Sequence, residues 1–99
     1  MHIITRKRLN EFVEQKDKTA KPALERWYRL MKKCNFQSPI ELLQTFSREN
    51  VDQVNNLTVF DIGGKSAARL IAAIHYDRKK VYIRAVLTHA EYDKGNWKE

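Results

Sequence analysis

The sequence predicts an α+β fold in which N-terminal helices pack on one face of a small, twisted, mainly antiparallel sheet. Apolar residues recur at helical spacing up to about residue 46, whereas from Val51 onward runs rich in Ile, Val, Leu and Tyr are separated by turn residues. The chain has 99 residues, 42% of them hydrophobic, which is enough for one core. We therefore expect a single domain over residues 1–99.

The first elements are a short strand and an amphipathic helix. Residues 1–5 read as the strand, and Thr5 is placed to cap a helix that ends near Lys16. Leu9, Phe12 and Val13 have the spacing of its buried face. Residues 17–19 are polar and predict a break in the chain.

Two further helices follow this break. Pro22 suits the first turn of the second helix. Ser38 and Glu41 form a capping box around Pro39, which predicts a short third helix over residues 39–46. The apolar stripe of the second helix comprises Leu24, Trp27, Tyr28, Met31 and Cys34.

Two hairpins and a terminal helical turn complete the prediction. Asn55 and Asn56 tolerate positive φ and fit a tight hairpin turn, and Gly63 with Gly64 ends the strand that follows. The second hairpin turns through the polar residues 77–80. The expected segments are strands over 51–54, 57–62, 67–76 and 81–87, with a helical turn over 89–94.

The last hairpin separates its side chains into two faces. A turn centred on Arg78 and Lys79 pairs Tyr76 with Val81, Ile74 with Ile83, Ala72 with Ala85, and Leu70 with Leu87. This apolar face needs the helices as its cover. The other face pairs His75 with Tyr82, Ala73 with Arg84, Ile71 with Val86, and Arg69 with Thr88. Arg69 and Arg84 are thus expected on the uncovered face, with His89 and Tyr92 at its end.

Charge and composition narrow the class of protein. The chain carries 19 Lys and Arg against 12 Asp and Glu, a net charge of +7, which favours a polyanionic partner, although basic residues can also serve solubility alone. It lacks both a signal-peptide pattern and an apolar run of about 18 residues, so we expect a cytoplasmic protein with no membrane contact. The single cysteine, Cys34, excludes an intramolecular disulfide, and no metal or cofactor is expected.

The residues on the uncovered face suit chemistry on RNA. Two arginines can grip a phosphate in a bidentate fork. RNA cleavage through the 2′-hydroxyl needs a general base, a general acid and cations, and His89 can be either the acid or the base. Tyr92 can hydrogen-bond the reacting oxygens or stack on an unstacked nucleobase. Each has a structural alternative: His89 can close the terminal turn, and Tyr92 can pack on the sheet edge. We expect Glu91 and Asp93 to be solvated or paired with Lys94.

A second group of residues is expected at the periphery of an RNA site. Two roles are open for Trp97: it can anchor the tail or stack on a nucleobase. The segment 63–66, Gly-Gly-Lys-Ser, lacks the glycine spacing of a phosphate-binding loop and joins two strands, so we do not assign it that role. The peripheral RNA-binding candidates are Lys65, Lys79, Lys80, His75 and Tyr82.

The chain resembles the HigB toxins of bacterial type II toxin-antitoxin modules, within the RelE-like superfamily. The resemblance lies in "MHIITRKRLNEF", "ALERWYRLMKKCNF", "VFDIGGKSAARLIAAIHY" and above all "VYIRAVLTHAEYDK". It implies a RelE-like α+β toxin that cleaves translated mRNA on the ribosome and is neutralised by a HigA-type antitoxin. It also implies that Arg69 and Arg84 stabilise the phosphate, that His89 and Tyr92 form the reactive turn, and that Lys65 corresponds to a loop lysine.

The assignment of acid and base stays open, because many relatives place a tyrosine or a lysine pair where this chain has His89. Two other functions are also kept as alternatives. One is a toxin that binds without cutting, as the gyrase-directed members of the superfamily do, and the other is an RNA-binding module.

Overall fold

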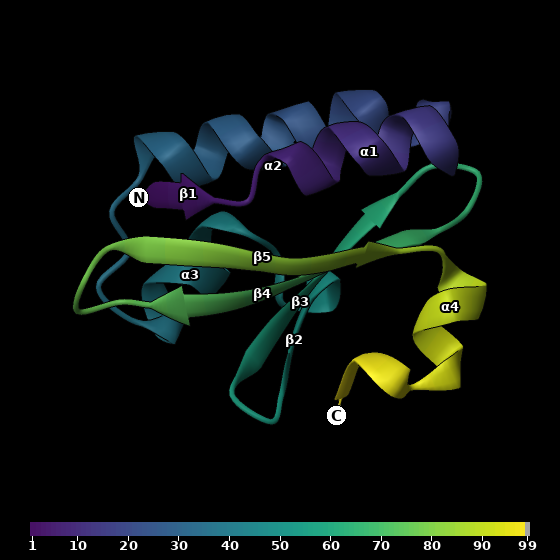
Figure 1. The fold of residues 1–99 in the computed structure, drawn as a ribbon. Coiled ribbons are helices and arrows are strands. Elements are labelled where there is room, and N and C mark those ends of the chain that lie inside the picture. Colours follow the sequence, from purple (N-terminus) through teal and green to yellow (C-terminus); the bar gives the residue numbers. More distant parts are fainter. Residues whose placement is uncertain (99) are drawn as a thin grey trace.

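The computed structural model describes residues 1–98 and contains one five-stranded sheet with the strand order β1-β5-β4-β3-β2 (Figure 1). β1 runs parallel to β5, and every other neighbouring pair is antiparallel, which confirms the predicted class. The strands are β1 (His2–Ile4), β2 (Val51–Val54), β3 (Leu57–Gly63), β4 (Ala68–His75) and β5 (Lys80–Leu87). The helices are α1 (Lys7–Gln15), α2 (Lys21–Lys33), α3 (Pro39–Thr45) and α4 (His89–Lys94), with the 3-10 turns η1 (Lys18–Ala20), η2 (Arg48–Asn50) and η3 (Asn96–Lys98).

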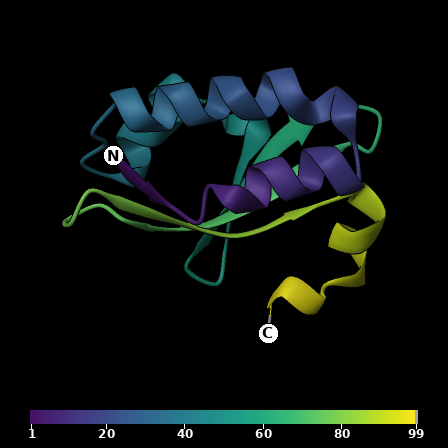
Figure 2. The same ribbon diagram turned by 45° about the horizontal axis from the view of Figure 1, so that its top comes forward.

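The N-terminal helices cover one face of the sheet, and the C-terminal segment lies on the other side (Figure 2). The apolar stripe of α2 enters the core, where the Trp27 and Phe60 rings pack edge to face with centroids 5.4 Å apart. Leu70 and Ile83 contribute from β4 and β5 and are essentially inaccessible to solvent. We call the face away from α1 and α2 the open face. Within residues 1–98, no helix has the length and apolarity to cross a membrane.

Several local predictions are confirmed. Pro22 lies in the first turn of α2, and the Ser38 side chain caps α3 by accepting from Glu41 N at 3.4 Å. Asn55 and Asn56 both have positive φ, 50° and 67°, in the turn between β2 and β3. The helical turn that follows β5 is α4, with the bounds predicted for it.

The predicted cap of α1 is wrong. Thr5 has φ 72°, and the residue at the N-cap is Arg6, whose side chain makes no capping hydrogen bond. The carbonyl of Thr5 instead accepts from Arg8 N at 3.1 Å. A residue in the left-handed region turns the chain sharply, and this turn places α1 against the sheet directly after β1.

The predicted register of the last hairpin is also wrong, because the turn is centred one residue earlier than predicted, with His75 opposite Lys80, and because β5 contains a bulge. Arg69 lies opposite Leu87, not Thr88, and Ile74 lies opposite Val81, not Ile83. The register shifts between the pairs Ile71–Ala85 and Ala72–Ile83, which leaves Arg84 as the extra residue. Beyond the bulge, Val86 faces the core in place of the predicted Ala85 and Leu87.

Candidate active site

Arg69 is fixed on the open face by three contacts. Its Nη1 donates to Oδ1 of Asp61, the residue opposite it on β3, at 2.9 Å, and to the carbonyl of Ala67 at 3.0 Å. The guanidinium carbon lies 5.5 Å from the centre of the Tyr92 ring. Nη1 thereby uses both its protons, and no hydrogen bond within residues 1–98 engages Nε or Nη2. That edge of the guanidinium can donate two parallel hydrogen bonds to a phosphate.

Arg84 lies on the open face, where its alternation with the buried Val81 and Ile83 places it. It is also the bulged residue of β5, so the bulge changes the facing of the residues that follow it, and Arg84 itself is exposed. It forms no ion pair with another described residue. It lines a hollow of about 440 Å³, which we call the Arg84 hollow, together with Asn55, Asn56, Leu57, Ala73, Ile74, His75, Trp97 and Lys98.

Arg69 and Tyr92 line a second hollow of about 320 Å³, the Arg69 hollow. Its walls are mixed in charge because η2 and β2 contribute Arg48, Glu49 and Asp52. The Tyr92 and Trp97 rings stack with centroids 5.0 Å apart and planes inclined by 16°. Since one ring lines each hollow, the stacked pair stands between the two. Trp97 Nε1 also donates to the carbonyl of Tyr92 at 2.9 Å, so the structure favours the tail-anchor role.

His89 is the first residue of α4. A capping box between Thr88 and Glu91 defines the start of this helix, and Gly95, at φ 76°, ends it. The backbone N of His89 donates to the carbonyl of Ser66 at 2.9 Å. Its imidazole Nε2 lies 3.1 Å from Asp93 Oδ2, and the imidazole is 53% exposed, so it stays accessible to a substrate.

The two acidic residues of α4 do not pair with Lys94. Asp93 contacts His89, and Glu91 Oε2 pairs with Lys16 Nζ at 3.3 Å. The backbone N–H of Thr88 donates to Glu91, and this hydrogen bond holds the pKa of that carboxyl below its ordinary value, with smaller contributions from Lys16 and the Thr88 hydroxyl. The Glu91 carboxylate therefore has a structural role, because it caps the N-terminus of α4.

The structure does not bring all the predicted RNA contacts to one place. Lys79 and Lys80 lie at the β4–β5 turn, at the end of the sheet opposite α4 (Figure 1). Lys79 Nζ donates to the carbonyl of Phe36 at 3.3 Å. His75 pairs with Lys80, not Tyr82, in the ladder, although the rings of His75 and Tyr82 meet edge to face at 5.2 Å.

Lys65 lies closer to the catalytic candidates. It is exposed in the loop between β3 and β4, next to Ser66, whose carbonyl holds His89. Its backbone N donates to Thr19 Oγ1 at 2.8 Å, which leaves the ammonium free to face solvent.

Sequence reasoning missed Asp61, the partner of Arg69. The signal was present, since Asp61 is the single charged residue of the strand 57–62 and is exposed. It also missed the buried acid Asp17, whose partner Ser66 is 49 residues away along the chain.

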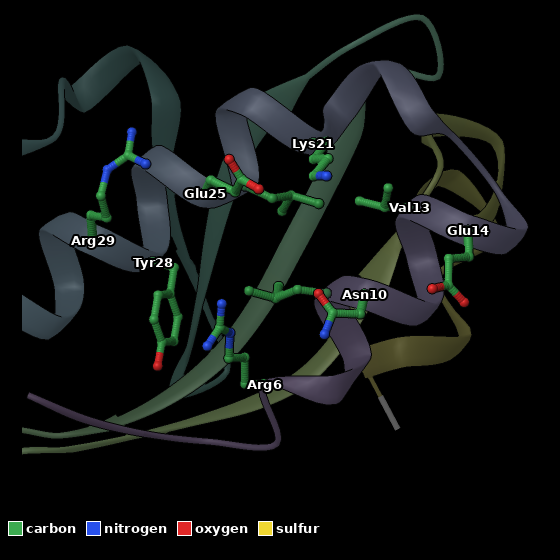
Figure 3. A pocket seen from close by; sticks show the side chains of 10 residues that line it. Arg6, Asn10, Val13, Glu14, Lys21, Glu25, Tyr28 and Arg29 are labelled. Atoms are coloured by element: carbon green, nitrogen blue, oxygen red, sulfur yellow. The ribbon is translucent and has the colours of Figure 1, made fainter.

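A third cavity lies between α1 and α2, on the side of the sheet opposite the arginines (Figure 3). This helix groove has a volume of about 530 Å³. Leu9, Val13 and Leu24 give it an apolar floor. The Arg6 guanidinium stacks over the Tyr28 ring at 4.3 Å at one end. Its other lining residues are Asn10, Glu14, Lys21, Glu25 and Arg29.

Comparison with known proteins agrees with this architecture. Residues 20–95 match the family model of the HigB toxin, the RelE-like toxic component of a toxin-antitoxin system. The mRNA interferase HigB of Escherichia coli O6:H1 is 34% identical over 95 residues, covering 95% of this chain and 90% of that protein. The mRNA interferase toxin HigB of Escherichia coli K12 and the mRNA interferase HigB of Shigella flexneri are each 35% identical over 96 residues, covering 94% of this chain and 88% of theirs. The chain therefore belongs to the HigB family of RelE-like toxins.

Proposed function

We propose that this toxin is an endoribonuclease that cleaves translated mRNA on the ribosome in the cytoplasm, inhibiting translation and growth until a HigA-type antitoxin neutralises it. The relatives that carry the name mRNA interferase support this activity. The observation that carries the proposal is the fixed guanidinium of Arg69, whose central carbon lies 5.5 Å from the ring centre of Tyr92, a residue of the same short helix as His89.

The proposed reaction is attack of a 2′-hydroxyl on the adjacent phosphorus. The 2′ oxygen forms the new bond, the bond to the 5′ oxygen breaks, and a 2′,3′-cyclic phosphate remains on the upstream fragment. One group must take the 2′ proton and another must give a proton to the leaving oxygen. His89 performs one of these two transfers.

The charge that develops on phosphorus is stabilised by the arginines. Arg69 offers Nε and Nη2, and Arg84 is free of ion pairs within the described residues. Two guanidinium ions supply this stabilisation without a divalent cation, so we expect the chemical step to need no metal ion bound by the toxin. Tyr92, which has Arg69 on one side and Trp97 on the other, positions a reacting oxygen or a base.

The HigA-type antitoxin has two candidate surfaces. An acidic segment could occupy the open face and compete with RNA for Arg69 and Arg84. It could alternatively occupy the helix groove and prevent docking on the ribosome. Titration of the toxin-antitoxin complex against ribosomes separates these modes, because the first predicts a complex that docks without cutting and the second predicts no docking.

The test of the activity is cleavage of a defined message, translated in a purified system, by the wild type, by His89→Ala and by Tyr92→Phe. We expect ribosome-dependent cuts whose upstream ends carry the cyclic phosphate or its opened product, and loss of cutting in His89→Ala. Growth arrest with intact message and arrested DNA supercoiling would instead support a toxin that binds without cutting.

A further inference from the structure

A buried carboxylate at the end of α1 holds the loop between β3 and β4. Asp17 is 8% exposed and accepts hydrogen bonds from four donors, two from Thr19 and two from Ser66. Ser66 N and Ser66 Oγ lie 2.9 and 2.7 Å from Asp17 Oδ2. No cation in the described part of the chain pairs with Asp17, so these N–H and O–H groups alone hold its charge.

The loop approaches Asp17 so closely that one position requires glycine. A Cβ on Gly64 would lie 2.9 Å from Asp17 Oδ2 and 3.2 Å from the Cα of Ala20. Thr19 Oγ1 accepts from Lys65 N at 2.8 Å, so three consecutive loop residues contact the same corner. The backbone donors of residues 65 and 66, which a phosphate-binding loop would offer to a ligand, are already used within the protein.

The same loop holds both catalytic candidates. The carbonyl of Ser66 accepts from His89 N at 2.9 Å, and the next carbonyl, that of Ala67, accepts from Arg69 Nη1 at 3.0 Å. Two adjacent peptide groups therefore hold the first residue of α4 and the guanidinium of Arg69. The ion pair between Lys16 and Glu91 adds a second link from the end of α1 to α4.

These polar links matter because α4 has little packing of its own. None of its residues is buried, so apolar burial contributes little to its position against the sheet. Its position depends on its hydrogen bond to Ser66, on the capping box, on Lys16 and on the stacked rings at its end. A local shift in loop residues 63–67 therefore moves His89 relative to Arg69.

We propose that Asp17 is a positioning residue for the nuclease centre, which it serves by fixing the β3–β4 loop and, through the peptides of residues 66 and 67, the relation between His89 and Arg69. This inference rests on the proposed catalytic roles of His89 and Arg69. Asp17 is remote from the substrate in this account and touches no reacting atom. A displacement of about 1 Å in such a pair can reduce a rate by about a hundredfold.

The test compares Asp17→Asn with Asp77→Asn, an exposed aspartate in the turn at the far end of the sheet. We expect Asp17→Asn to lower kcat by about tenfold to a hundredfold with KM within about twofold of wild type, because the displaced groups keep their charges and still attract RNA but lose the geometry that the reaction needs. We expect hydrogen exchange of the His89 amide to accelerate about tenfold or more while the amides shared by β4 and β5 keep their protection. Asp77→Asn should change neither quantity.

Ser66→Ala provides a milder second variant, since it removes one hydroxyl donor and keeps the backbone donor. We expect the same pattern at smaller size. Wild-type kcat together with wild-type exchange at His89 in both variants overturns the positioning role, and so does a raised KM at unchanged kcat. The exchange measurement needs no catalysis, so a failure of the proposed nuclease roles shows separately, as full cleavage by His89→Ala and Arg69→Ala.

Discussion

Arg69 and Asp61 form an ion pair between directly opposite residues of neighbouring strands, with Nη1 2.9 Å from Oδ1. The Arg69 side chain is 21% exposed and that of Asp61 is 40% exposed, so the pair lies at the surface of the open face. Exposed pairs contribute little to stability, typically about 0 to 1 kcal/mol. The pair therefore matters more for orienting the guanidinium than for holding the fold.

Replacing Asp61 should strengthen RNA binding. Asp61→Asn keeps an acceptor for Arg69 but removes a negative charge that repels phosphate, so we expect KM to fall by about twofold to fivefold. Steady-state cleavage at low ionic strength measures the effect, and added salt should diminish it. Asp77→Asn is the matched control. An unchanged or higher KM in Asp61→Asn would contradict the claim that the charge of Asp61 weakens RNA binding.

A comparison of Gly64 with Gly95 distinguishes the cost of backbone strain from the cost of a steric clash. Both have similar positive φ, 79° and 76°, but only at Gly64 would a Cβ meet other atoms within 4 Å. We expect Gly95→Ala to lower the free energy of unfolding by about 1 kcal/mol and Gly64→Ala to lower it by about 2 to 4 kcal/mol. Urea unfolding of the two variants checks this, and equal losses would show that the approach to Asp17 is not tight.

Asp17 should make stability sensitive to acid. The Thr19 hydroxyl, followed by the donors of Ser66, holds the pKa of Asp17 far below its ordinary value of 3.8. A carboxyl with a depressed folded pKa contributes stability fully above its unfolded pKa and loses that contribution as the pH falls below it. The free energy of unfolding of the wild type should therefore fall more steeply below about pH 4 than that of Asp17→Asn. Urea titrations at several pH values give both slopes, and parallel slopes would refute the assignment.

Trp97 should control the position of Tyr92. Trp97→Ala removes the stacked ring and the hydrogen bond to the Tyr92 carbonyl, a loss of about 1 kcal/mol for the tail. We expect cleavage to fall by about fivefold to tenfold, because Tyr92 loses its support. Trp97→Phe restores a ring without the N–H and should recover most of the activity. Equal activity of Trp97→Ala and wild type would show that the stacked rings only anchor the C-terminal tail and do not position Tyr92 for cleavage.

Local signals in the sequence were sufficient for most elements. Pro22, the Ser38 cap, the Asn55-Asn56 turn and the bounds of α4 each depend on residues within a few positions of one another. Local signals did not predict the register of β5. Its residues around Arg84 are almost all apolar, so alternation does not mark which of them face the core, and a bulge leaves no pattern in such a run.

The candidate site shows the same division between local and distant information. The hydrophobic pattern placed Arg69 and Arg84 on the open face correctly, although the pairing used to argue it was wrong. The contacts that fix the site join distant segments: Asp17 with Ser66, and Lys16 with Glu91. Nothing in the composition of residues 16–19 indicates these partners, because the segment reads as an ordinary polar break.

The central claim is that the open-face arginines stabilise the phosphate during cleavage of translated mRNA. The direct test is single-turnover cleavage of a ribosome-bound message by Arg69→Ala, Arg84→Ala and Arg78→Ala, with Arg78 as the control because it is exposed in the turn far from α4. We predict that the first two variants cut about a hundredfold to a thousandfold more slowly and that Arg78→Ala cuts at nearly the wild-type rate. Wild-type rates for Arg69→Ala and Arg84→Ala would contradict the account.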